Sequence, residues 1–139
     1  MSKRKFYILL SSVSLILGFL IYVFFRENSY IGILFGYFHI IRTAREMLGW
    51  VSFGFLTFYF PDFLWGFSLC CGLLAIYTPK QTGCIVCSSI TVLCGIIWEW
   101  IQFKQLVSGT GDFCDVLMYL MASIACIIIN IRSEVNEKN

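Results

Sequence analysis

Glu99 is a carboxylate in a place where a membrane helix tolerates charge poorly. It lies one turn before the end of residues 83–102, an apolar run of 20 residues that is long enough to cross a bilayer. A charged side chain inside such a segment costs roughly 2.5–3.5 kcal/mol on insertion scales. The helix macrodipole also disfavours negative charge near a C-terminal end. The groups that stabilise Glu99 therefore define the first candidate site.

Small and polar residues recur at helical spacing on this run and on the next one, an arrangement that lets membrane helices pack closely. The first face holds Cys84, Ser88, Thr91, Gly95, Glu99 and Gln102, and the second holds Asp112, Asp115, Tyr119, Ala122, Cys126 and Asn130. We expect the two faces to oppose each other along a seam. This contact would bring Glu99 and Gln102 close to Asp112, Asp115 and Tyr119, and packing alone does not explain so acidic an end.

Helix capping is an alternative explanation for three of the acidic residues. Asp62 follows Pro61 in the first turn of an apolar run, where the helix dipole stabilises a carboxylate. Asp112 can cap the last helix, and Asp115 follows three residues later in the manner of a capping box. Glu99 has no such explanation.

Carboxylates this close together cannot all be ionised unless cations compensate them. The candidates are Arg42, Arg45, Lys104 or a bound metal ion. We favour the arginines because a planar guanidinium satisfies a carboxylate in a two-point contact. We therefore expect residues 30–60 to fold back over the seam and to bring Arg42 or Arg45 to it, and we expect no metal and no other cofactor.

The composition indicates an integral membrane protein. The chain has 139 residues, of which 59% are hydrophobic and 13% are charged, whereas soluble chains carry about 25% charge. We expect a single all-α membrane domain with four transmembrane helices, near residues 6–25, 61–77, 83–102 and 112–131. The shorter apolar runs within residues 30–60 predict an interfacial or re-entrant helical segment after the first span. This length leaves no room for a soluble catalytic or nucleic-acid-binding domain.

Basic residues suggest the orientation. Lys3, Arg4 and Lys5 precede the first apolar run, and such residues are retained on the cytoplasmic side. With four spans we expect both termini to be cytoplasmic and Glu99, Asp112 and Asp115 to lie at the outer boundary of the membrane.

Residues 98–123, WEWIQFKQLVSGTGDFCDVLMYLMAS, resemble the signature of the VanZ-like family of small bacterial membrane proteins. In that family a Glu-x-x-Gln pair ends one helix, and an Asp begins the next after a polar loop. Glu99, Gln102 and Asp115 match this pattern, and Asp112 fits its acidic variation. Tyr119 and Ala122 stand where Asn and Gly are usual, and the loop lacks its usual Arg.

The resemblance implies a role in the cell envelope and in tolerance to teicoplanin-type glycopeptides, without a catalytic mechanism. Our leading hypothesis is a protein that binds a polar head group or amphiphile at the outer leaflet through Glu99, Gln102, Asp112, Asp115 and Tyr119, with Arg42 or Arg45 as counter-charge. A second hypothesis is an accessory or assembly subunit whose acidic seam docks a membrane-protein partner. The least favoured is an enzyme that acts on a lipid-linked substrate, and its catalytic residues are unknown.

Overall fold

The computed structural model describes residues 2–26, 30–48, 54–77, 81–107 and 111–138, and within them it contains helices and turns only. Four helices are long, and three short ones lie between the first two of these. The long helices are α1 (Lys3–Phe25), α5 (Phe60–Ile76), α6 (Gln81–Phe103) and α7 (Phe113–Lys138). The short helices are α2 (Tyr30–Gly36), α3 (His39–Leu48) and α4 (Gly54–Phe58).

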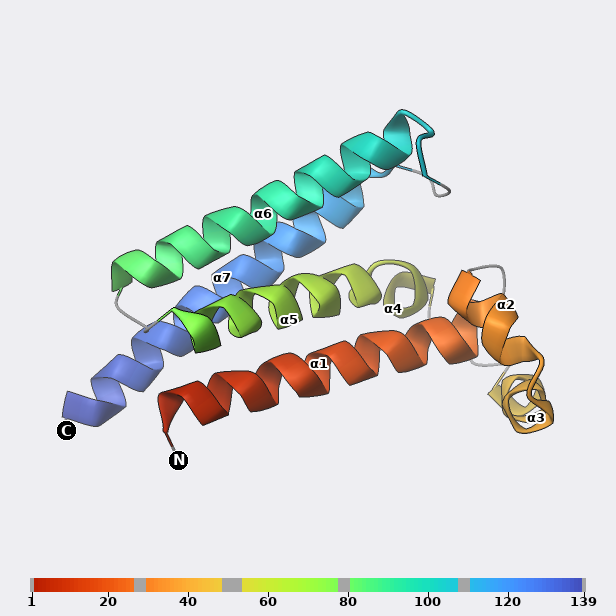
Figure 1. Cartoon of the computed structure of the whole chain (residues 1–139), viewed down its shortest axis with the longest axis horizontal. Coiled ribbons are helices and arrows are strands. Elements are labelled where there is room, and N and C mark those ends of the chain that lie inside the picture. The colour runs from red at the N-terminus through yellow and green to blue at the C-terminus, as the bar shows by residue number, and fades with distance from the viewer. Residues whose placement is uncertain (1, 27–29, 49–53, 78–80, 108–110, 139) are drawn as a thin grey trace.

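The long helices run side by side with α5 in the middle (Figure 1). Helix α5 contacts α1 on one side and both α6 and α7 on the other, and α6 packs along α7. Both termini lie at one end of this bundle, while α2, α3 and α4 lie at the other (Figure 1). The end of α6 and the start of α7 also lie at this second end, together with the start of α5.

Length and composition make these helices membrane helices. In the described parts of the chain, three segments are long and apolar enough to cross a bilayer, namely Lys3–Phe25, Gly83–Phe103 and Phe113–Ser133. Helix α5 is apolar but shorter, with 17 residues, which corresponds to about 25 Å. The predicted all-α membrane fold is confirmed. Residues 30–60, where we expected an interfacial or re-entrant segment, form only the short helices α2 to α4 in their described parts.

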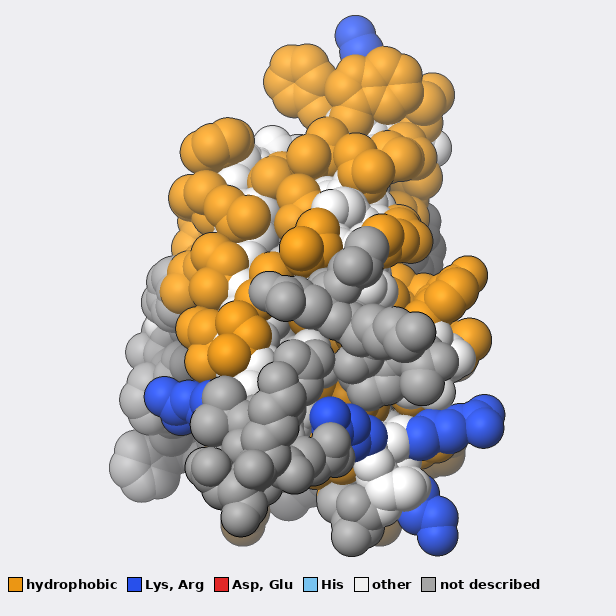
Figure 2. Space-filling view, turned by 90° about the vertical axis from the view of Figure 1, so that its left-hand side faces the viewer, with side chains coloured by type: hydrophobic (Ala, Val, Ile, Leu, Met, Phe, Trp, Pro, Cys, Tyr) orange, Lys and Arg blue, Asp and Glu red, His pale blue; other side chains and the backbone are white. Residues whose placement is uncertain are grey.

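The described charged residues at the end of the bundle that carries both termini are basic. Figure 2 looks onto this end, and the described charged side chains in view are Lys and Arg. The residues that supply this charge are Lys3, Arg4 and Lys5 at the start of α1 and Arg132 in α7. The two ends of the bundle therefore differ in charge, because the buried carboxylates described below gather at the opposite end.

The predicted seam between α6 and α7 is confirmed. A Cβ atom built on Gly95 of α6 would lie 2.5 Å from Cγ of Tyr119 in α7, so the ring of Tyr119 packs directly on this glycine. Further along, the Ser123 hydroxyl donates to the Ser88 carbonyl over 3.3 Å. The small residues thus allow the close helix approach that their spacing predicts.

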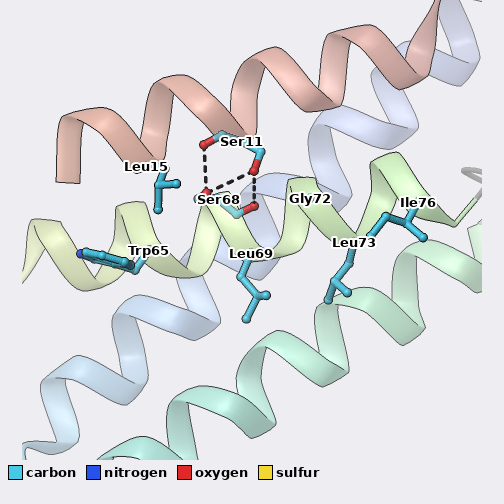
Figure 3. A pocket seen from close by; sticks show the side chains of 8 residues that line it. All are labelled: Ser11, Leu15, Trp65, Ser68, Leu69, Gly72, Leu73 and Ile76. Atoms are coloured by element: carbon cyan, nitrogen blue, oxygen red, sulfur yellow. Dashed lines mark hydrogen bonds between the residues drawn. The ribbon is translucent and has the colours of Figure 1, made fainter. Parts of the chain in front are cut away.

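Helix α5 holds the rest of the bundle together through small and polar contacts. The Ser11 hydroxyl of α1 donates to the Ser68 carbonyl over 2.8 Å, and the Ser68 hydroxyl donates to the Ser11 carbonyl over 2.9 Å. Figure 3 shows this pair within a shallow groove of about 360 Å³ between α1 and α5. On the opposite side of α5, the Sγ atoms of Cys71 and Cys126 are 3.3 Å apart, and both residues are fully buried.

Candidate ligand site at the acidic end of the bundle

Asp112 caps the start of α7, as the sequence predicts. Its Oδ1 accepts a hydrogen bond from the backbone N–H of Cys114 over 3.0 Å. This bond satisfies one of the backbone N–H groups that have no partner within the helix. The first turn of α7 is therefore fixed by the residue that precedes it.

Glu99 completes this cap from a different helix. Its Oε2 accepts a hydrogen bond from the backbone N–H of Asp112 over 3.0 Å, which is the bond that the third residue of a helix makes in a capping box. Glu99 lies near the C-terminal end of α6, which disfavours negative charge. It also lies at the N-terminal end of α7, which attracts negative charge. This explains how a carboxylate with 6% exposure is accommodated, and it requires no arginine.

The turn between α6 and α7 is built to make this bond. Helix α6 ends with the N–H of Gln105 donating to the Gln102 carbonyl and the N–H of Leu106 donating to the Ile101 carbonyl. This pair of bonds is a Schellman motif, with Gln105 in the left-handed region at φ 56°. Gly111 then returns so close to α6 that a Cβ atom on it would lie 2.7 Å from the Glu99 carbonyl oxygen. Only glycine permits this approach, which places Asp112 beside Glu99.

Asp115 does not accept the capping-box bond from Asp112, because the Asp112 N–H donates to Glu99 instead. Its Oδ1 is buried and has no hydrogen-bond partner among the described residues. The carboxyl group lies within electrostatic range of Asp62, Glu99 and Asp112. We refer to these four residues as the acidic cluster. Buried carboxylate oxygens without a donor are costly, so Asp115 stands out as the member with capacity for a further partner.

Arg26 is the described basic residue whose charge acts on members of the acidic cluster. It is the residue that ends α1, and its Nη1 donates to the Tyr22 hydroxyl over 2.8 Å, with the guanidinium 4.9 Å from the centre of the Tyr22 ring. From there its charge acts on Asp62 and on Asp115. Asp62 lies in the first turn of α5 and is 8% exposed. Arg26 is absent from the predicted site residues, because its spacing in the sequence gives no sign of its proximity to Asp62 and Asp115.

Tyr59 links the start of α5 to the start of α7. Its hydroxyl donates to Oδ2 of Asp112 over 3.3 Å. The nearby Asp112 carboxylate raises the pKa of Tyr59, because it disfavours a second negative charge. Sequence spacing gave no signal for this contact, since 53 residues separate the two partners.

The expected counter-charges lie elsewhere. Arg45 donates from Nε and Nη2 to the Val23 carbonyl, over 2.8 and 2.6 Å, and from Nη2 to the Gly32 carbonyl over 2.7 Å. Arg42 is exposed on the same helix, α3. This helix contacts α1 and α2, so among the described residues it does not fold back over the seam. Arg45 is therefore not the counter-charge of the seam, because its guanidinium is bound to carbonyl groups of α1 and α2. The role expected for Arg42 stays a prediction.

The remaining predicted site residues have different surroundings. Gln102 is half-buried in the last turn of α6, and its proximity to the acidic cluster stays a prediction. Tyr119 lies between Gly66 and Gly95, within electrostatic range of Asp62, Glu99 and Asp115. The described His, Cys, Asp and Glu residues contain no group of three that could hold a metal ion.

No family model, curated protein or solved structure matches the chain. The site is therefore interpreted from its own chemistry. Among the described residues, four carboxyl groups stand near the guanidinium of Arg26, partly shielded from water and at the boundary of a membrane bundle. This excess of negative charge and of hydrogen-bond acceptors suits a cationic partner that can donate hydrogen bonds.

Proposed function

We propose that this chain is a VanZ-like protein of the bacterial cell envelope that binds an amine-bearing head group of an amphiphile at the acidic cluster. The observation that carries the proposal is the buried Oδ1 of Asp115, which has no donor among the described residues. A primary ammonium supplies three N–H donors and a positive charge. Binding of this kind would contribute to tolerance of teicoplanin-type glycopeptides.

The charge of the site favours this class of ligand. Asp62, Glu99, Asp112 and Asp115 outnumber Arg26, and Glu99 and Asp112 are already engaged with backbone N–H groups. A cation that enters next to Asp115 lowers the repulsion among all four carboxylates. A phosphate or carboxylate ligand would raise this repulsion, so we do not favour an anionic head group.

The run of basic residues at the N-terminus supports an outward-facing site. Lys3, Arg4, Lys5 and Arg132 lie at the end of the bundle opposite to the acidic cluster. Positively charged segments are retained in the cytoplasm, so we place both termini there. The acidic cluster then faces the outer leaflet of the cytoplasmic membrane, where envelope amphiphiles and glycopeptides meet the cell.

The VanZ-like part of the proposal rests on the residues that carry the resemblance. Glu99, Asp112 and Asp115 of that signature come together at one point, around the start of α7. In the proposed binding site Glu99 and Asp112 hold the helix ends in place, and Asp115 receives the ligand. Gln102 and Tyr119 keep their predicted binding roles as part of the proposal.

A structural lock is the competing function, and the bond between Glu99 and the Asp112 N–H favours it for these two residues. If the acidic cluster served folding or partner docking alone, Asp115 would contribute little. Asp115 therefore distinguishes the two functions better than Glu99 does.

The cellular test uses a strain of the native host in which the gene is deleted. We expect the deletion to raise sensitivity to a teicoplanin-type glycopeptide several-fold and the wild-type gene to restore tolerance. Asp115→Asn should fail to restore it, because the variant lacks the negative charge that faces the ligand. Glu46→Gln is the matched control, since it removes an exposed carboxylate on α3 outside the acidic cluster, and it should restore tolerance.

Immunoblots and thermal melting of the purified variants check that all proteins are present and folded. Unchanged sensitivity in the deletion strain would contradict the envelope role. Full complementation by Asp115→Asn would contradict the binding role of the acidic cluster and would favour the structural lock.

A further inference from the structure

Helix α3 is amphipathic and leaves its apolar side uncovered. Ile40 and Met47 are 81% and 71% exposed, and helical spacing puts them on one side of α3. His39 and Glu46 lie on the other side and are also exposed. In water such an apolar side would be an unfavourable surface. Something apolar therefore covers Ile40 and Met47 in the native setting.

The direction of α3 identifies what covers it. Figure 1 shows α3 nearly end-on, whereas α1 lies across the view, so α3 runs across the direction of α1. The long helices define the direction across the membrane, because three of them have the length and composition of spans. A helix that runs across this direction at the end of α1 lies along the membrane surface. Tyr37 and Phe38 precede it and are 84% and 60% exposed, which is typical of aromatic residues at a membrane boundary.

Arg45 fixes α3 at this depth. Its guanidinium donates to the carbonyl of Val23, one of the last carbonyl groups of α1, which have no partner within their helix. It also donates to the Gly32 carbonyl of α2. These bonds join α3 to the end of a spanning helix. They also satisfy N–H donors of a charged guanidinium that would otherwise have to be hydrated.

We infer that α3 lies in the plane of the membrane–water interface, with Ile40 and Met47 in the acyl region of the phospholipids and with His39 and Glu46 among the head groups. The occupant of the uncovered side is the bilayer itself. The apolar surface of the bundle and the apolar side of α3 then form one continuous lipid contact. This assignment is independent of the proposed ligand at the acidic cluster.

The experiment places a genetically encoded fluorescent amino acid at one position at a time in the full chain. The matched pairs are positions 39 and 40 and positions 46 and 47, so that each apolar position has a polar neighbour in sequence. The proteins are reconstituted in phosphatidylcholine vesicles with and without lipids brominated high on the acyl chain. Aqueous iodide serves as the second quencher, and circular dichroism confirms the helix content.

We expect brominated lipid to quench positions 40 and 47 at least threefold more strongly than positions 39 and 46. Iodide should show the reverse order. Equal quenching within each pair would overturn the inference. Weak lipid quenching at positions 40 and 47 would also overturn it, because a second copy or another protein would then cover this side of α3.

Discussion

Replacing Gly95 with alanine should destabilise the bundle more than any other single methyl group placed on α6. The added Cβ would lie 2.5 Å from Cγ, 2.7 Å from Cδ2 and 2.9 Å from Cβ of Tyr119. The ring cannot move away freely, because a Cβ atom on Gly66 of α5 would already lie 2.9 Å from its Cδ1 atom. Overpacking of this kind costs about 1–3 kcal/mol, and we expect the upper part of that range.

Thermal melting in detergent, followed by circular dichroism, measures this effect. Gly54→Ala is the matched control, because a Cβ atom at Gly54 would meet no atom of the described residues within 4 Å, and its melting temperature should not fall. The double variant Gly95→Ala/Tyr119→Ala should be less destabilised than the sum of its single variants, since the clash needs both partners. Additive effects, or a Gly95→Ala protein as stable as Gly54→Ala, would show that Tyr119 does not pack on Gly95.

Replacing Gly111 with alanine should separate the end of α6 from the start of α7. Its Cβ would lie 2.7 Å from the Glu99 carbonyl oxygen and 2.8 Å from the Phe103 nitrogen. Both atoms belong to the backbone, so no side-chain rotation relieves the clash. Asp112 is the next residue, and its N–H would be withdrawn from Glu99. A buried acceptor that loses its donor costs about 1–3 kcal/mol and more when it is charged.

Hydrogen–deuterium exchange on the purified protein reports this change at the relevant place. We expect the amides of the first turns of α7 to exchange at least tenfold faster in Gly111→Ala than in the wild type. In Glu99→Gln these amides should exchange nearly as slowly as in the wild type, because a glutamine carbonyl can still accept the bond from the Asp112 N–H. Unchanged exchange in Gly111→Ala would mean that the bond between Glu99 and Asp112 does not hold the turn.

Much of the fold could be predicted from hydrophobicity and helical spacing. The long apolar runs predict the long helices, and the small residues around Gly95 and Ala122 predict the seam because close packing needs small side chains. Asp112 could be predicted as a cap because its type and its position before an apolar run are typical of helix starts. These signals are local, because each of them is a pattern among residues close together in the sequence.

The groups that interact with Glu99 and Asp62 could not be predicted in the same way. Residue types identify charged side chains such as those of Arg42 and Arg45 as possible partners of Glu99. They do not identify a backbone N–H, such as that of Asp112, as the donor. Which arginine reaches which group depends on the path of α2 and α3, and this path is set by tertiary contacts such as those of Arg45 with Val23 and Gly32. The roles of Asp115 and Gln102 in ligand binding stay predictions.

Binding of two amphiphiles to the protein in phosphatidylcholine nanodiscs tests the central claim most directly. Dodecylammonium and dodecyltrimethylammonium carry the same charge and chain, but only the first can donate N–H bonds to Asp115. A charge-assisted hydrogen bond contributes about 1.5–3 kcal/mol, and 1.4 kcal/mol is about a tenfold change in affinity. By titration calorimetry, corrected for empty nanodiscs, we predict at least tenfold tighter binding of dodecylammonium to the wild type and loss of this preference in Asp115→Asn. Equal binding of both amphiphiles to the wild type and to Asp115→Asn would contradict a ligand site at the acidic cluster.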